Sequence, residues 1–262
     1  MSAGRIITVR RGAIGELRID NPDKFNAMSL GMWHELAART REFAAEDDLR
    51  VVLLRGEGER AFVSGADITE FDTKRSAASG SADYDAAVEA AQHALMACPH
   101  PVVASIRGVC MGGGLGLAMA CDLRYGALDA RFRMPAARLG LGYSFRGVEQ
   151  MVHRIGAPRV ADLFFTARTF DGAEAMRIGL LQAAFGPDEL DARIEALLSQ
   201  IAANAPLTVR LAKRSIELAR RLAPEADNAE IERLRAACVA SEDYAEGRRA
   251  FAQKRAPNFT GR

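Results

Sequence analysis

The sequence has little of what usually identifies a redox or metal protein. Its 262 residues contain four cysteines, one tryptophan and 6% aromatic residues. No two cysteines have Cys-x-x-Cys spacing, and no His-Glu-x-x-His motif occurs. Three of the cysteines (Cys98, Cys110 and Cys121) lie in apolar runs, which predicts buried free thiols. We therefore expect neither disulfides nor a metal site.

Excess charge is also absent. The chain has 35 basic and 34 acidic residues and a net charge of +1, which gives no basis for binding nucleic acid or an anionic membrane. The longest uncharged apolar run, residues 108–121, is too short and too rich in glycine to span a bilayer. Residues 1–11 lack the apolar segment of a secretory signal. These features predict a soluble, cytoplasmic protein.

The chain has enough apolar residues, 49%, for a full core. Its first half alternates strand-like runs with helical patterns, as in strands at 51–54 and 102–106 and a helix at 85–97. Residues 72–83 are polar and rich in serine, glycine and alanine, and we interpret them as a mobile loop beside a site. From about residue 147 onward the pattern is helical.

This order of elements predicts two parts. Residues 1–200 would form a core of repeated β-β-α units. Residues 201–262 would form a helical region too thin to have its own core, so it would pack on the first part or on a neighbouring subunit.

Two glycine-rich segments, Ser64–Ile68 and Met111–Gly116, carry most of the functional information. Each follows an apolar run and predicts a strand-to-helix turn, whose free N–H groups point at an anion or a developing oxyanion. Two such turns facing one pocket would stabilise an enolate. The glycines do not match the G-x-G-x-x-G dinucleotide motif or a P-loop, so a nicotinamide oxidoreductase is a weak alternative.

Other motifs accompany these turns in order along the chain: Asn21–Ala27, Ala61–Ile68, Arg107-Gly108, Ala120–Asp122, Thr166–Arg168, Ala175–Leu180 and Phe251–Arg255. Together they resemble the crotonase family of enoyl-CoA hydratases, isomerases and relatives. The resemblance implies an α/β fold, a spiral of β-β-α units with a C-terminal helical trimerisation region. It also implies an acyl-CoA substrate, a homotrimer or dimer of trimers, and no tightly bound cofactor besides the coenzyme A of the substrate.

The resemblance also implies site residues. The backbone amides of Ala66 and Gly113 would form the oxyanion hole. Residues at the matching coenzyme A positions are Lys24, Phe25, Ala66, Asp67, Ile68 and Thr69, with Phe251 and Lys254 near the nucleotide end. From the residues alone, an exposed lysine and a helical aromatic are more often surface and core. Asp67 and Asp122 are typical of groups that hydrogen-bond helix ends.

The chain departs from the family at two positions. Family hydratases use two glutamates to activate water and deliver a proton, and these positions are Gly116 and Ala136 here. Neither residue can act as a general acid or base. The standard route to hydration is therefore doubtful, and so is a single-carboxylate isomerase that uses the second position.

The segment Leu139–Tyr143 resembles the malonyl-type acyl-CoA decarboxylases of the family, in which a tyrosine at the Tyr143 position orients a carboxylate. A histidine that some of them carry at the Ala66 position is absent. Arg146 is a candidate partner for a substrate carboxylate, and Glu149 is a candidate base if it points inward. Three alternatives stay open: a lyase or isomerase acting through an enolate, a malonyl-type decarboxylase, and an acyl-CoA-binding protein without catalysis.

Overall fold

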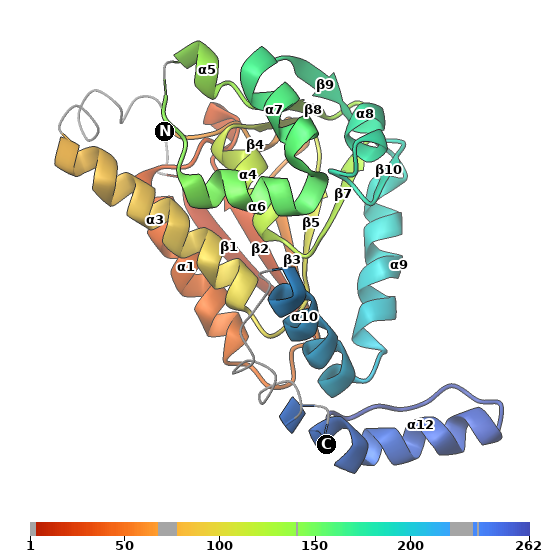
Figure 1. The fold of residues 1–262 in the computed structure, drawn as a ribbon. Coiled ribbons are helices and arrows are strands. Elements are labelled where there is room, and N and C mark those ends of the chain that lie inside the picture. Colours follow the sequence, from red (N-terminus) through yellow and green to blue (C-terminus); the bar gives the residue numbers. More distant parts are fainter. Residues whose placement is uncertain (1–3, 68–77, 140, 221–232, 235) are drawn as a thin grey trace.

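The computed structural model describes residues 4–67, 78–139, 141–220, 233–234 and 236–262 (Figure 1). Its strands form two sheets. The six-stranded sheet has the order β1 (Arg5–Arg11), β2 (Ile14–Asp20), β3 (Val51–Gly56), β5 (Val102–Ile106), β7 (Leu123–Ala127) and β10 (Ala183–Phe185). The four-stranded sheet has the order β4 (Ala61–Val63), β6 (Val109–Met111), β8 (Arg131–Arg133) and β9 (Thr169–Asp171).

The strands and helices alternate as the sequence predicts. In the units that begin with β3, β5 and β7, the first strand joins the large sheet and the next joins the small sheet. Strands of successive units pair in parallel within each sheet, and β5 is buried along its whole length. A strand is buried in this way only where both faces of the sheet are covered. The predicted spiral of β-β-α units is therefore confirmed.

Two long helices pack side by side; the first lies on β1 and β2 of the large sheet, and the second packs on the first and on α4 (Gly113–Ala120) (Figure 1). They are α1 (Leu30–Ala44) and α3 (Ala78–Ala97). The Ser29 hydroxyl caps α1 by accepting a hydrogen bond from the Met32 N–H, as predicted. The remaining helices are α4 (Gly113–Ala120), α5 (Ala136–Leu139), α6 (Phe145–Ile155), α7 (Ala157–Thr166), α8 (Gly172–Arg177), α9 (Leu190–Ala202), α10 (Pro206–Arg220) and α12 (Glu242–Ala252), with a short 3-10 turn at Pro22–Lys24.

Two predictions about local structure were wrong. The loop expected at 72–83 is helical from Ala78, and the rest of it lies outside the described residues. Packing of α3 on the core overrides the weak helix propensity of its glycine and serines. The second half is also not all helical, because β9 and β10 extend the two sheets. Each is only three residues long, too short to leave a strand periodicity in the sequence.

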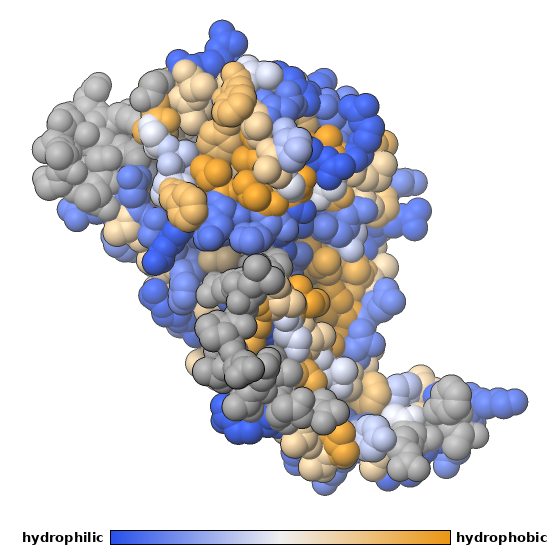
Figure 2. All heavy atoms as spheres, in the orientation of Figure 1, coloured by the Kyte–Doolittle hydropathy of each residue, from blue (hydrophilic) through white to orange (hydrophobic). Residues whose placement is uncertain are grey.

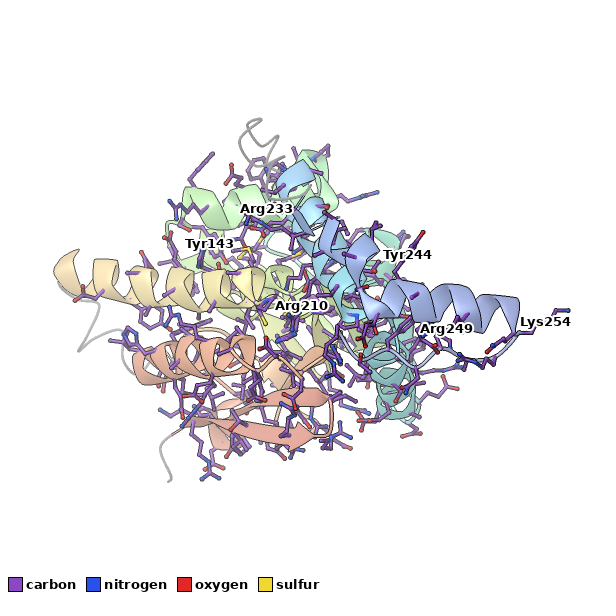
Figure 3. All side chains as sticks on the ribbon, turned by 90° about the horizontal axis from the view of Figure 1, so that it is seen from below. Tyr143, Arg210, Arg233, Tyr244, Arg249 and Lys254 are labelled. Atoms are coloured by element: carbon purple, nitrogen blue, oxygen red, sulfur yellow. The ribbon has the colours of Figure 1, made fainter. Side chains whose placement is uncertain are left out.

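The C-terminal region meets the core through α10. Lys213 Nζ lies 2.7 Å from Asp122 Oδ2 and donates to the carbonyl oxygen of His100 at 2.9 Å. Asp122 also accepts a hydrogen bond from the Val102 N–H, so it joins α10 to the start of β5 rather than capping a helix. Helix α12 stands away from the rest of the chain in two perpendicular views (Figures 1 and 3). The division at residue 200 and the role in oligomerisation stay predictions.

Apolar side chains gather on one face of the molecule, over α5, α6 and α7 (Figure 2). Leu139, Phe145 and Phe165 are all largely exposed there. Large exposed apolar patches often mark interaction sites. Among the helices described, none is long and apolar enough to cross a membrane.

Helix α4 begins in very close contact with the end of β4. Its N-cap, Gly112, has a φ of +51°, which side chains other than glycine rarely adopt. A Cβ added to Gly114 would lie 2.2 Å from the carbonyl oxygen of Val63. Only glycine allows the helix to start this close to the strand.

We predict that Gly114→Ala lowers the free energy of unfolding by about 1–3 kcal/mol or more, because backbone must move to admit the methyl group. Gly142→Ala is the control, since nothing lies within 4 Å of its added Cβ. The control should change stability little. Urea unfolding followed by circular dichroism measures both, and equal stability of the two variants would contradict the packing described.

His100 supplies a pH-dependent term in stability. Its side chain is buried, and its Nε2 has no partner among the described residues. Burial, and then the positive charges of Arg210 and Lys213, lower the pKa of His100 to about 4. The folded state thus favours the neutral imidazole.

We predict that this stabilisation is complete above pH 6.5 and is lost as the pH falls toward 4. The loss should be roughly 3 kcal/mol relative to His100→Gln, which cannot be protonated in this range. Urea unfolding at pH 7.5, 6, 5 and 4 measures it. Parallel pH profiles for the two proteins would show that His100 is not responsible.

Candidate functional site

The two glycine-rich turns meet at one small pocket of ≈ 80 Å³, which we call the central pocket. Helix α3 and the segment before α6 complete its wall. Its lining residues are Trp33, Ala66, Tyr84, Asp85, Val88, Glu89, Gln92, Gly113, Leu141, Gly142, Tyr143, Ser144 and Gly147. The structure therefore brings together the three predicted catalytic residues, Ala66, Gly113 and Tyr143.

The amide of Ala66 is oriented by a short parallel bridge to Met28. The Met28 N–H donates to Gly65 O at 2.9 Å, and the Asp67 N–H donates to Met28 O at 2.9 Å. Ala66 lies between these two bonds, so its own N–H is directed to the other side of the chain. Within the described residues that N–H has no acceptor.

The amide of Gly113 is free for a different reason. Gly113 is the first residue of α4, and the first N–H groups of a helix have no acceptor within it. The Trp33 indole lies beside it, 3.3 Å from where a Cβ on Gly113 would be. Ala66 and Gly113, the two residues with free amides, both line the central pocket.

A buried chain of hydrogen bonds braces the Ala66 side of the pocket. Trp33 Nε1 donates to the Tyr84 hydroxyl at 2.8 Å, and that hydroxyl donates to Met28 O at 2.9 Å. Met28 in turn holds the backbone on both sides of Ala66. The direction of the Ala66 N–H is thus set by side chains from α1 and α3, which we did not predict from the sequence.

Three of the predicted coenzyme A residues lie beside Ala66. Lys24 Nζ is 2.7 Å from Asp67 Oδ2, and Asp67 is buried, so the two form an ion pair. Phe25 is in the left-handed region (φ +52°), with the Arg60 guanidinium 3.9 Å from its ring centroid. The carbonyl oxygen of Phe25 accepts a hydrogen bond from the Ser64 N–H. Ile68 and Thr69 lie outside the described residues.

Tyr143 fills space that two glycines leave open. A Cβ on Gly116 would lie 2.5 Å from its hydroxyl oxygen, and a Cβ on Gly147 would lie 2.5 Å from its Cε1. The ring also packs edge-on against Phe164, with centroids 5.3 Å apart. The Tyr143 hydroxyl therefore occupies the place where a side chain at position 116 would begin. Burial raises the pKa of this hydroxyl above its ordinary value, so it stays protonated at neutral pH.

One face of α3 contributes residues that the sequence analysis did not single out. Asp85, Val88, Glu89 and Gln92 have the spacing i, i+3, i+4, i+7 of a single helix face. Polar residues on an otherwise apolar face were the available signal. Asp85 is exposed and Glu89 half-buried, whereas Gln92 is only 4% exposed. The acidic side chains thus lie toward solvent and the neutral amide lies inside.

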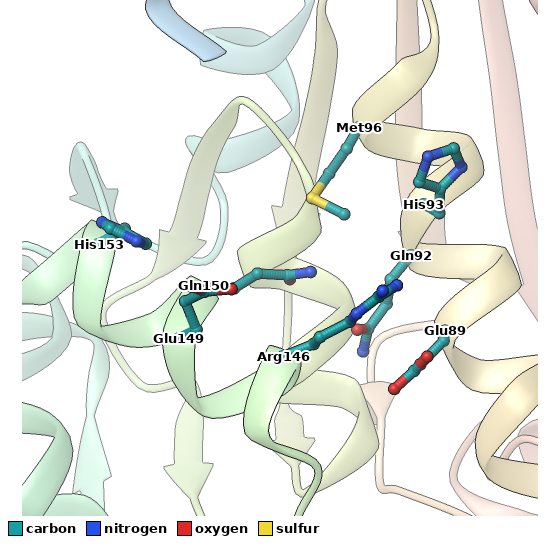
Figure 4. Close-up of a pocket in the computed structure, with 8 residues that line it drawn as sticks. All are labelled: Glu89, Gln92, His93, Met96, Arg146, Glu149, Gln150 and His153. Atoms are coloured by element: carbon teal, nitrogen blue, oxygen red, sulfur yellow. The ribbon is translucent and has the colours of Figure 1, made fainter. Parts of the chain in front are cut away.

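A second, larger cavity of ≈ 440 Å³ adjoins the central pocket between α3 and α6, and we call it the α3–α6 groove. Figure 4 shows Arg146 reaching from α6 toward Gln92 and Glu89 on α3. Glu149 lines this groove and is exposed. Arg146 and Glu149 are therefore in the groove and do not line the central pocket. The groove is lined by Glu89, Gln92, His93, Met96, Arg146, Glu149, Gln150 and His153.

Within one chain, the C-terminal residues predicted to contact coenzyme A do not lie near the central pocket. Lys254 is exposed beyond the end of α12, on the part of the chain that projects outward (Figure 3). Phe251 lies on α12, and its side chain is outside what the structure describes. Ala136, the second position that lacks a glutamate, is buried at the start of α5.

The cysteines supply no nucleophile to the site. All four are free, and Cys98, Cys110 and Cys121 are buried, as predicted. Burial raises the pKa of the Cys110 thiol and raises that of Cys121 to about 12, so both stay neutral and unreactive. Within the described residues, no three His, Cys, Asp or Glu side chains gather as a metal site would require.

Comparisons with known proteins agree with this geometry. A short-chain-enoyl-CoA hydratase from Clostridium acetobutylicum is 29% identical over 255 residues, which are 97% of each chain. A carnitinyl-CoA dehydratase from Proteus mirabilis is 32% identical over 259 residues, 96% of this chain and 97% of that one. The crystal structure of an enoyl-CoA hydratase/carnithine racemase from Magnetospirillum magneticum has a TM-score of 0.93 and 37% identity, and the match covers 98% of this chain and 96% of that one.

The sequence profile of the family described as enoyl-CoA hydratase/isomerase matches residues 10–262. The match covers nearly the whole chain. The chain therefore belongs to the enoyl-CoA hydratase/isomerase family, and it has the crotonase fold of that family.

Proposed function

We propose that this enzyme binds an acyl-CoA thioester with the carbonyl oxygen in the central pocket, where the N–H groups of Ala66 and Gly113 donate to it. These donors stabilise the negative charge that develops on the oxygen when an enolate forms. In acyl-transfer sites one such donor lowers the activation barrier by about 2.7–4 kcal/mol. The free amides and the rigid support of Ala66 favour this role.

The coenzyme A part of the substrate extends from Ala66 past Lys24, Phe25 and Asp67. Because Lys254 lies far from the pocket within one chain, its predicted contact to the nucleotide end requires a neighbouring copy. This proposal therefore includes the homotrimer or dimer of trimers that the family resemblance implies.

The reaction we propose is loss of CO₂ from a malonyl-type thioester. One observation carries this: the Tyr143 hydroxyl occupies the space at Gly116, so a neutral hydrogen-bond donor stands where family hydratases have a carboxylate. Ala136 removes the second carboxylate. Decarboxylation needs no base, whereas hydration by the two-glutamate route needs one carboxylate to activate water and another to deliver a proton to carbon.

In this reaction the bond between the α-carbon and the carboxylate breaks, and CO₂ leaves. The electron pair of that bond moves into the thioester as an enolate, whose oxygen is held by Ala66 and Gly113. The enolate carbon then takes a proton, which the Tyr143 hydroxyl is placed to donate and which water replaces. The net change is one carboxylate and one proton converted to one C–H bond and CO₂.

A second reaction has an observation in its favour. Glu89 lines the central pocket and is a carboxylate, so it is a candidate base for isomerisation or for hydration by a route of its own. Several relatives carry the names of hydratases, so these reactions are the natural comparison. An acyl-CoA-binding protein without catalysis is the remaining alternative.

We predict that, in a panel of acyl-CoA thioesters, malonyl-, methylmalonyl- or ethylmalonyl-CoA loses CO₂ on incubation with the enzyme. Mass spectrometry measures each product, with heat-inactivated enzyme as the control. Enoyl-CoA substrates that gain water would overturn the argument from Gly116 and Ala136. A change in retention time without a change in mass, abolished in Glu89→Gln, would support isomerisation. Binding with no product at all would leave only the non-catalytic role.

We predict that Tyr143→Phe lowers kcat for the thioester that loses CO₂ by on the order of 10²-fold, because the donor facing the acyl group is lost. The affinity for coenzyme A should not change, since the ring and its packing remain. Tyr125→Phe is the matched control, because Tyr125 stacks on Phe185 away from the pocket. An unchanged kcat in Tyr143→Phe would remove this hydroxyl from the mechanism.

A further inference from the structure

Gln92 has an unusual combination of properties. It is 4% exposed, and within the described residues its amide has no hydrogen-bond partner. The amide atoms are not among the side-chain atoms that are fully shielded from solvent, so a ligand that enters the pocket can pair with them. Gln92 lines both the central pocket and the α3–α6 groove, so a ligand in the pocket can reach it.

The amide points at the same place as the Tyr143 hydroxyl. Gln92 Nε2 lies 2.9 Å, and the Tyr143 hydroxyl oxygen 2.5 Å, from the position of a Cβ on Gly116. The two groups do not bond each other. They come from different elements, α3 and the segment before α6, and converge because Gly116 has no side chain. Two neutral donors thus lie close together beside Gly116, and both residues line the central pocket.

We propose that Gln92 and Tyr143 together bind a carboxylate on the acyl group, and that Gln92 is the residue that makes this enzyme select carboxylated thioesters. This rests on the proposed function and names its substrate class. Two donors that converge from different directions suit the two oxygens of one carboxylate. The central pocket has ≈ 80 Å³. This small volume favours a carboxylate close to the thioester.

The neutrality of both donors suits decarboxylation. A cation at this position would stabilise the substrate carboxylate strongly and lose that interaction as CO₂ forms. Neutral donors orient the carboxylate with less ground-state stabilisation, which leaves a smaller barrier to its loss. Of the acidic residues on the same helix face, Asp85 is exposed and Glu89 is half-buried. Arg146 does not line the central pocket; it reaches toward Gln92 and Glu89 from across the groove (Figure 4).

The test is Gln92→Leu, which keeps the size of the side chain and removes its donor. For a malonyl-type substrate we expect KM to rise about tenfold or more, because a hydrogen bond to a charged group is lost. The Kd for a sulfonate analogue, in which SO₃⁻ replaces the carboxylate and cannot leave, should rise equally. The Kd of the corresponding thioester without a carboxyl group should stay within twofold. Calorimetry gives both Kd values.

Gln150→Leu is the matched control, because this half-buried glutamine lines only the groove, from α6. It should leave all three constants unchanged. Gln92→Glu is the second variant, because its side chain keeps the shape of glutamine and its charge repels a carboxylate. This variant should no longer bind the sulfonate analogue but should still bind the thioester without a carboxyl group. Thermal unfolding of each variant shows whether it is folded.

The outcomes separate this inference from the proposed function. If the unaltered enzyme decarboxylates no substrate, the proposed reaction fails. If it does decarboxylate, but Gln92→Leu and Gln92→Glu keep the ratio of affinities for carboxylated and uncarboxylated thioesters, then the role of Gln92 is wrong. Weakening of both kinds of thioester by the same factor would also overturn it, since that indicates a structural role.

Discussion

The close packing of the start of α4 against the end of β4 is the constraint on which the site depends. Gly114 lets the helix begin within contact distance of Val63 O, and this puts the free N–H of Gly113 in the central pocket. The bridge between Met28 and the segment around Ala66 supplies the second free N–H. Backbone groups held this way need no reorganisation when charge develops on an oxygen between them, which is why such sites can hold an enolate. The side chains facing these amides then decide the reaction.

Those side chains differ here from what a two-glutamate hydratase needs. Where family hydratases have a glutamate, this chain has Gly116, and the space is filled by Tyr143, whose ring lies where Gly116 and Gly147 have no side chain. Gln92 lies beside the same space, is 4% exposed and lines the central pocket. A substrate group that pairs with its amide gains a hydrogen bond, and with it specificity.

Much of this could be predicted from the sequence, for identifiable reasons. Long apolar strands, the Ser29 cap and the two glycine-rich turns are local signals, and they gave the order of elements and both oxyanion-hole candidates. The short strands β9 and β10 have only three residues each and carry no local signal. Helix α3 begins earlier than its composition indicates, because tertiary packing stabilises it. Gln92 and Glu89 were missed because a polar residue on a helix face gains meaning only when another element packs opposite it. Arg146, close to Tyr143 in sequence, lines the groove instead, since α6 turns it toward α3.

A crystal structure of the enzyme with a bound acyl-CoA thioester tests the central claim most directly. The account predicts that the thioester oxygen lies about 2.7–3.1 Å from both the Ala66 and the Gly113 nitrogen. It also predicts that the acyl group faces the Tyr143 hydroxyl beside Gly116. A thioester carbonyl away from both nitrogens, or an acyl group lying in the α3–α6 groove with the central pocket unused, would contradict it.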